Sequence, residues 1–204
     1  MLTLFLKGGP VMWPLLALSL LALTVIFERI VFVVREWSRR DTNAVTEIFH
    51  AVKRGELAAA KAIGTRSRDY LARILTYALR HQDSFSNALV KAANDELQRF
   101  NRGISLLDTI ITLAPLLGLF GTVTGMIHAF SLLGGSELGA PTAITGGIAE
   151  ALLATAFGLL IAMTSLLPFN YLNTRVEEAR QNIETAAAHL EMLLLRTEKE
   201  TAFR

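Results

Sequence analysis

The sequence predicts an all-α polytopic membrane protein, with three transmembrane helices and long helices that extend into the cytoplasm. Hydrophobic residues make up 52% of the 204 residues and charged residues only 19%. The apolar residues gather in three blocks of at least 20 residues, at 8–27, 104–133 and 143–172. At about 1.5 Å per residue, each block can cross a hydrocarbon core of about 30 Å. Buried helices of a soluble protein would need polar stripes that these blocks lack.

The first block belongs to an N-terminal segment and first transmembrane helix at residues 1–34. A secretory signal would have a shorter apolar region followed by a cleavage site of small residues. Here the uncharged run of 20 residues ends in Glu28-Arg29-Ile30 and another apolar turn. We therefore expect the segment to be retained as an anchor.

Residues 35–103 form a predicted cytoplasmic helical region with 13 Lys and Arg against 8 Asp and Glu, a net charge of +5. This charge suits contact with anionic lipid headgroups, although a solvated helical face explains it as well. The last helix starts near Ser86 as its N-cap and is expected to run unbroken through Arg102 into the second span. The preceding helices are expected at 41–53, 56–63 and 66–81, with a break at Gly55.

Basic residues set the expected orientation. Arginines follow the first span and precede the second, whereas the connecting loop at residues 134–142 contains no Lys or Arg. The positive-inside rule therefore places residues 35–103 and the C-terminal helix 173–204 in the cytoplasm. The N-terminus and the loop are expected on the opposite, outer side.

Small residues recur at helical spacing in the second span, 104–133, and the third, 143–172. Such stripes let membrane helices pack closely, and packing explains most of their members. Thr122 and Thr155 lie at similar depth if the two spans are antiparallel, which suits a shared polar lining. The stripes comprise Gly118, Thr122, Gly125 and Ala129 in the second span, and Gly147, Ala151, Thr155, Gly158, Ala162 and Ser165 in the third.

Glu150 is an ionisable group in the outer half of the third span, where a carboxylate should face protein or water rather than lipid. It marks an ion path or stabilises contacts between helices, and the sequence leaves both open. Pro115 removes a backbone hydrogen bond in the second span and predicts a kink near Ile111.

The sequence favours no enzyme. It contains no cysteine, no nucleotide-binding or hydrolase motif, and no histidine spacing typical of a metal site. A net charge of +2 gives no bulk basic surface for nucleic acid. No cofactor or metal is expected, and membrane lipid is an expected partner.

Two stretches, LAPLLGLFGTVTGMIHAF at 113–130 and GGIAEALLATAFGL at 146–159, resemble the signatures of the ExbB/TolQ/MotA proton-channel family, most closely ExbB. The resemblance implies a pentamer in the bacterial inner membrane, with the second and third spans lining a central pore. It implies an ExbD/TolR-like single-span partner with an intramembrane aspartate, and a TonB-like or TolA-like protein that spans the periplasm. Thr122, Thr155 and Glu150 match the family's hydroxyl and glutamate positions, and Pro115 its proline. Thr124 departs from the pattern, because a bulky aromatic residue is common there.

The implied function is that of a motor subunit, which couples proton-motive force to TonB-dependent transport across the outer membrane. In that interpretation Thr122, Thr155 and Glu150 lie along the proton pathway. The small residues at 118, 125, 147, 151, 158 and 162 pack on the pore face. A TolQ-like role in envelope integrity or another motor task is the alternative within the family. A purely structural membrane scaffold is the alternative outside it.

Overall fold

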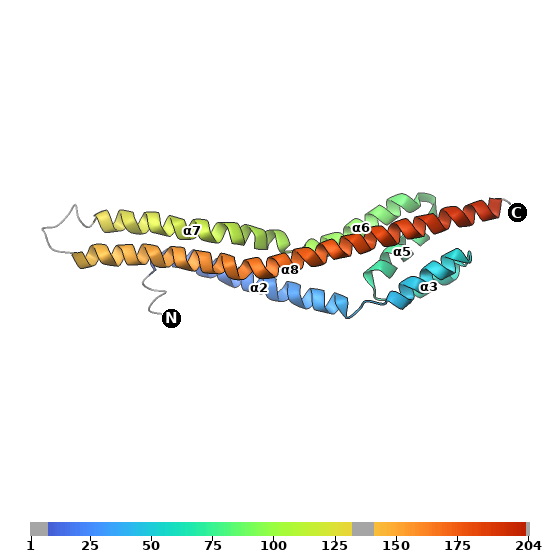
Figure 1. Cartoon of the computed structure of the whole chain (residues 1–204), viewed down its shortest axis with the longest axis horizontal. Helices are drawn as coiled ribbons and strands as arrows, with labels where there is room; N and C mark the ends of the chain where they lie inside the picture. Colours follow the sequence, from blue (N-terminus) through green and yellow to red (C-terminus); the bar gives the residue numbers. More distant parts are fainter. Residues whose placement is uncertain (1–7, 132–140, 203–204) are drawn as a thin grey trace. The chain divides into compact units, whose positions relative to one another are not determined.

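The computed structural model describes residues 8–131 and 141–202, with side chains for residues 8–131 and 145–196, and the regular elements of this part of the chain are all helices (Figure 1). Three of them, α2, α7 and α8, are long and apolar enough to cross a membrane. The predicted all-α fold with three candidate spans is therefore confirmed. The elements are α2 (Met12–Trp37), α3 (Thr42–Lys53), α4 (Leu57–Arg66), α5 (Tyr70–Arg80), the short 3-10 helix η1 (Gln82–Ser84), α6 (Phe85–Asn101), α7 (Ile104–Ser131) and α8 (Pro141–Ala202).

The chain divides into two compact units, to which α2 and α8 both contribute. The spanning unit comprises Met1–Arg29 and Gly103–Tyr171. The bundle unit comprises Ile30–Arg102 and Leu172–Arg204. Each unit has its own packing and is described separately below.

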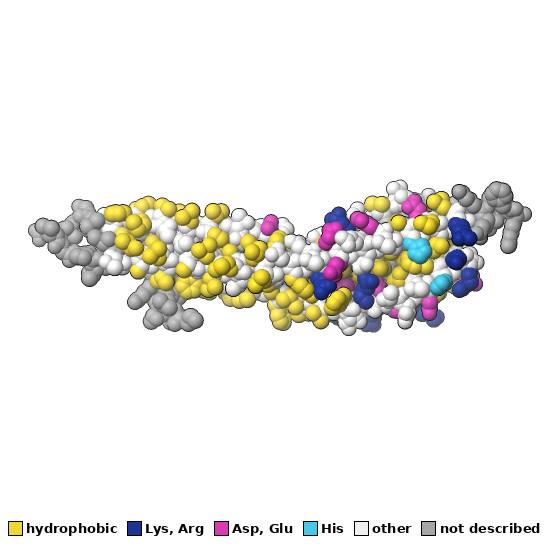
Figure 2. Space-filling model, viewed as in Figure 1, with side chains coloured by type: hydrophobic (Ala, Val, Ile, Leu, Met, Phe, Trp, Pro, Cys, Tyr) yellow, Lys and Arg dark blue, Asp and Glu magenta, His cyan; other side chains and the backbone are white. Residues whose placement is uncertain are grey.

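The spanning unit has a narrow buried core and an apolar exterior. Val11, Met12 and Leu15 of the α2 segment are buried together with Ala114 of α7. Many large side chains point outward instead, among them Phe27 and Leu167, each about three-quarters exposed. Figure 2 shows such hydrophobic side chains across the visible face of this unit. Apolar side chains on the exterior are compatible with lipid as the surrounding solvent.

The bundle unit packs the amphipathic helices α3 to α6 with the later part of α8. One face of α5 is buried, including Leu75 and Leu79, while charged side chains gather on the outer surface of the unit (Figure 2). Asp69 is almost fully buried. Its burial is tolerated because its carboxylate accepts hydrogen bonds from the backbone N–H groups of Leu71 and Asp41, each at 2.8 Å. It therefore caps α5 and ties the start of α3 to it.

The helices expected at 41–53, 56–63 and 66–81 are present as α3, α4 and α5, although α4 ends three residues later and α5 begins four residues later than expected. Asp41 caps α3 by accepting from the Ala44 N–H at 3.0 Å. The prediction of an unbroken helix from Ser86 into the second span was wrong. The helix α6 begins at Phe85 after the N-cap Ser84, and the chain turns at Gly103, whose φ of +77° only glycine adopts readily.

The helix α8 continues from the predicted third span through the predicted C-terminal helix, and it contains Pro168, at which no kink was predicted. Most of the predicted loop at 134–142 lies outside the described residues.

Candidate functional site

The helices α7 and α8 of the spanning unit approach each other through their small residues. A Cβ placed on Gly118 would lie 2.9 Å from the Cα of Thr155, and one on Gly125 would lie 2.9 Å from the Cβ of Ala151. Further along, a Cβ placed on Gly147 of α8 would lie 2.8 Å from the Cβ of Ala129 on α7. The pairs run in opposite directions along the two helices, which are therefore antiparallel. Side chains larger than hydrogen at the glycine positions would separate the backbones.

The closest backbone approach lies at Gly158. A Cβ there would be 2.5 Å from the carbonyl oxygen of Ala114 and 3.2 Å from the Cα of Gly118. Ala162, one turn further along α8, is also buried. The predicted small-residue stripes thus contact each other within one chain, and their orientation toward a pore stays a prediction.

Thr155 joins the two helices through a hydrogen bond. Its hydroxyl donates to the carbonyl oxygen of Gly118 at 2.9 Å. The bond is possible because the absence of a side chain at Gly118 brings the α7 backbone within reach of α8. Gly118 lies one turn from Thr122, so the two threonines occupy neighbouring levels of the helix pair.

Thr122 has a different environment, on the flank of α7 beside the glycine stripe. Its hydroxyl donates to the carbonyl oxygen of Leu119 in the same helix at 2.6 Å. The side chain is half-buried and lines a shallow depression together with Met126 and Phe130. Within the single chain, the depression is open and mainly apolar, and its two hydroxyls, of Thr122 and Ser131, both donate to carbonyls of their own helix.

Glu150 lies on the face of α8 that meets the segment leading into α2. Its carboxylate is packed against Gly9, so that a Cβ at this glycine would overlap it. Gly9 has a φ of +73°. Its carbonyl oxygen accepts a hydrogen bond from the N–H of Met12 at 3.1 Å, which closes the turn before α2. Glu150 and Thr155 therefore contact different elements of the unit.

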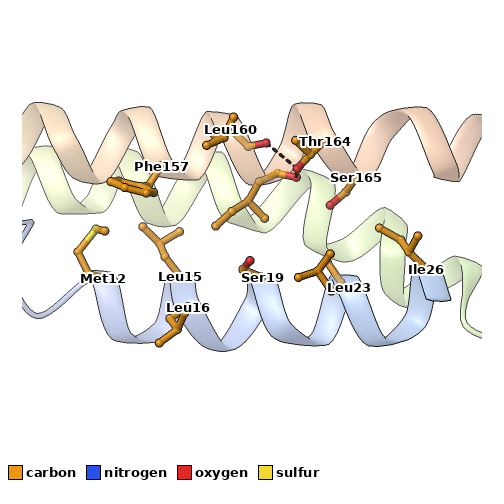
Figure 3. Close-up of a pocket in the computed structure, with 12 residues that line it drawn as sticks. Met12, Leu15, Leu16, Ser19, Leu23, Ile26, Phe157, Leu160, Thr164 and Ser165 are labelled. Atoms are coloured by element: carbon orange, nitrogen blue, oxygen red, sulfur yellow. Dashed lines mark hydrogen bonds between the residues drawn. The ribbon is translucent and has the colours of Figure 1, made fainter. Parts of the chain in front are cut away.

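A groove of about 400 Å³ follows the same side of α8, between this helix and α2 (Figure 3). Its walls are mainly apolar, with Met12 and Leu15 from α2 facing Phe157 from α8. Thr164 lines it too, but its hydroxyl donates back to the carbonyl oxygen of Leu160 at 2.8 Å. Such back-bonding satisfies the Thr164 hydroxyl at little cost. Two further hydroxyls, of Ser19 from α2 and Ser165 from α8, also line the groove.

Pro115 lies inside α7 and cannot donate to the carbonyl of Ile111, because its ring nitrogen carries no hydrogen. The helix nonetheless continues to Ser131. The kink near Ile111 stays a prediction.

Two glycines of the site were missed in the sequence. Gly9 positions the carboxylate of Glu150, and Gly121 packs against the side chain of Ala154 on α8. The motif GLFGTV contained a signal for Gly121, because a second glycine three residues after Gly118 widens the smooth face of the helix. Among the described residues no group of acids, histidines or cysteines could hold a metal ion.

Comparison with known proteins decides the family. The sequence model of the MotA/TolQ/ExbB proton channel family matches residues 65–185, which include both small-residue stripes. The chain belongs to this family. Over 200 residues it is 40% identical to the biopolymer transport protein ExbB-like 1 of Synechocystis sp., a match that covers 93% of this chain and 77% of that protein.

Two further relatives match over about half of this chain. The biopolymer transport protein ExbB of Neisseria meningitidis is 39% identical over 48% of this chain and 45% of its own length. The Tol-Pal system protein TolQ of Haemophilus influenzae is 38% identical over 47% of this chain and 42% of its own length. Family membership and the three apolar helices together identify a membrane protein of the proton channel type.

Proposed function

We propose that this chain is the ExbB-like subunit of an inner-membrane motor, in which an ExbD-like single-span partner carries the proton on an intramembrane aspartate. The observation that carries the proposal is the family match over residues 65–185, which contain Thr122 and Thr155 on two helices joined by a hydrogen bond. Five copies would surround the partner, and a TonB-like protein would transmit the work to the outer membrane. The N-terminus would be periplasmic and the C-terminus cytoplasmic.

The hydroxyl geometry suggests how the chain would act on the partner's aspartate. A threonine hydroxyl has one donor and two acceptor lone pairs. The hydroxyls of Thr122 and Thr155 both donate to backbone carbonyls, of Leu119 and Gly118 respectively. What remains are acceptor lone pairs, which bind a protonated carboxyl group and do not neutralise a carboxylate. The pair would thus favour the protonated aspartate as it passes the level of the threonines.

Proton flux tests this role. The chain and its single-span partner are reconstituted in liposomes, and an internal pH dye reports proton entry under an imposed potential. We expect Thr122→Val and Thr155→Val each to lower the flux about tenfold or more, while the matched changes Thr124→Val and Thr164→Val leave it unchanged. Like Thr122, these control threonines donate to carbonyls of their own helices, but they lie outside the predicted proton pathway. Unchanged flux in both test variants would rule out the hydroxyl role.

The role of Glu150 is separated from that of the threonines by a second measurement. If the carboxylate lies on the proton path, Glu150→Gln lowers the flux per assembled complex. If it only fixes contacts, Glu150→Gln reduces the amount of complex and leaves the flux per complex normal. Its position against Gly9, away from Thr155, favours the second result.

A TolQ-like role is the second candidate, supported by the 38% identity to the TolQ protein of Haemophilus influenzae. The two tasks differ in the periplasmic partner. Deletion of the gene in its host distinguishes them: loss of energised uptake across the outer membrane supports the ExbB-like role, and leakage of periplasmic proteins supports the TolQ-like role.

A further inference from the structure

The bundle unit contains a basic pocket that the proposed motor function does not use. It has a volume of 1090 Å³ and is lined on one side by the end of α2 and the residues after it, and on the other by the link between α4 and α5. Five of its eleven lining residues are arginines, namely Arg35, Arg39, Arg40, Arg66 and Arg68.

Four of these arginines have no acidic partner among the described residues. Arg40 pairs with the buried Asp69 at 3.5 Å and donates to the Tyr70 hydroxyl at 2.6 Å. No such ion pair forms at Arg35, Arg39, Arg66 or Arg68 within the part of the chain that the structure describes. Elsewhere in the bundle unit, Arg73 bonds to two carboxylates, and Arg99 bonds to one. The basic pocket therefore concentrates positive charge that the fold itself leaves uncompensated.

The only acid in the lining is already engaged. The carboxylate of Asp41 caps α3 by accepting from Ala44, and its own N–H donates to Asp69. Its negative charge is stabilised by the positive end of the α3 dipole. Five arginines and one aspartate give the lining a formal charge of +4, of which the charge of Arg40 is balanced by Asp69 outside the lining. The remaining positive charge favours an anionic ligand.

The apolar part of the lining indicates where that anion comes from. Ile30, Val31 and Val34 line the pocket and are 40%, 48% and 60% exposed. They extend the apolar sequence of α2 directly up to Arg35. Exposed aliphatic residues that adjoin exposed arginines are typical of the boundary between lipid tails and headgroups. A site for a free phosphate ion would gain nothing from an aliphatic surface beside the arginines.

We infer that this basic pocket binds the phosphate headgroup of an anionic phospholipid, with the acyl chains lying along Ile30, Val31 and Val34. The guanidinium groups from the two walls match phosphate oxygens in planar, two-point geometry. A bound lipid would join the end of α2 to the α4–α5 link through its headgroup.

Native mass spectrometry of the full chain in detergent micelles tests the site. Dioleoyl phosphatidylglycerol is titrated against dioleoyl phosphatidylcholine, with and without millimolar inorganic phosphate. The pocket triple variant carries Arg39→Gln, Arg66→Gln and Arg68→Gln. A control triple removes the same charge elsewhere in the bundle unit, through Lys53→Gln, Arg54→Gln and Lys61→Gln.

We expect the wild-type chain to prefer phosphatidylglycerol, and phosphate not to displace it. The pocket triple should bind this lipid roughly 100-fold more weakly, since each arginine near an anionic surface contributes about a factor of five. The control triple should bind as the wild type does. Circular dichroism checks that the variants fold; should the pocket triple unfold, the pair Arg35→Gln and Arg66→Gln removes one arginine from each wall.

Three results would overturn the inference. Equal weakening in both triples would mean attraction by net charge alone. Displacement of phosphatidylglycerol by inorganic phosphate would mean a site for a free anion. A wild-type chain that binds both lipids equally would mean that the pocket does not select a headgroup at all.

Discussion

Replacement of Gly158 by alanine gives the sharpest test of how α7 and α8 pack. The new Cβ would lie 2.5 Å from the carbonyl oxygen of Ala114, whereas an ordinary carbon–oxygen contact is about 3.3 Å. The carbonyl belongs to the backbone of α7 and cannot rotate away as a side chain would. The helices must therefore open by roughly 0.8 Å at this level, which also strains the hydrogen bond from Thr155 to Gly118.

The expected cost follows from comparison with Gly146→Ala. Gly146 is helical too, but nothing lies within 4 Å of the place its Cβ would take. Both variants gain the same helix propensity, up to about 1 kcal/mol. The difference between them then isolates the overpacking, for which about 1–3 kcal/mol is typical. We expect Gly158→Ala to unfold more easily than Gly146→Ala by this amount.

The measurement is unfolding of the full chain in mixed micelles of mild and denaturing detergent, followed by circular dichroism. Because the chain has no cysteine, a spin-label pair introduced on α7 and α8 reports their separation directly. Equal stability of the two variants, with an unchanged separation, would refute the close backbone contact at Gly158.

Three further changes test other contacts. Arg73→Gln leaves the buried carboxylate of Glu36 without its cation, whereas Glu96 keeps Arg99, and the change should lower the free energy of unfolding by about 2 kcal/mol. Removal of the exposed pair of Arg54 and Glu56 should have little effect on stability. Burial raises the pKa of Tyr70, so the unfolded chain loses the phenol proton at a lower pH than the folded chain does. The free energy of unfolding should therefore fall as pH rises above about 10, and it should fall less steeply with pH in Tyr70→Phe. Gly9→Ala should lower the free energy of unfolding by at least about 1 kcal/mol. The loss should be clearly smaller when Glu150→Ala has already removed the overlapping carboxylate. Additive effects of the two changes would contradict their contact.

Much of the fold could be predicted because its signals are local. Apolar runs of membrane length defined the three candidate spans, and an aspartate at the right place capped α3. The turn at Gly103 could not be predicted in this way. A lone glycine inside a helical pattern is usually tolerated, and only the three-dimensional context forces its φ to +77°.

The candidate site was predictable in composition but not in contacts. Small residues at helical spacing indicated that α7 and α8 approach closely, and the structure describes that approach at Gly118 and Gly158. The contact between Glu150 and Gly9 joins residues far apart in the chain, and no pattern along one helix contains it. The same holds for the basic pocket, whose two walls come from separate segments that only folding brings together.

Packing and polar function need not be alternatives in this helix pair. The glycines that let α7 and α8 touch also bring the Gly118 carbonyl within 2.9 Å of the Thr155 hydroxyl. That bond fixes the rotamer of Thr155 and so the direction of its free lone pairs, as a rigid scaffold fixes any binding group. A larger residue at Gly118 would press on the backbone of Thr155, with its Cβ 2.9 Å from the Thr155 Cα, and would so displace the hydroxyl. Loss of proton flux in Gly118→Ala with the complex still assembled would follow from this coupling, and normal flux would mean that the smooth interface serves packing alone.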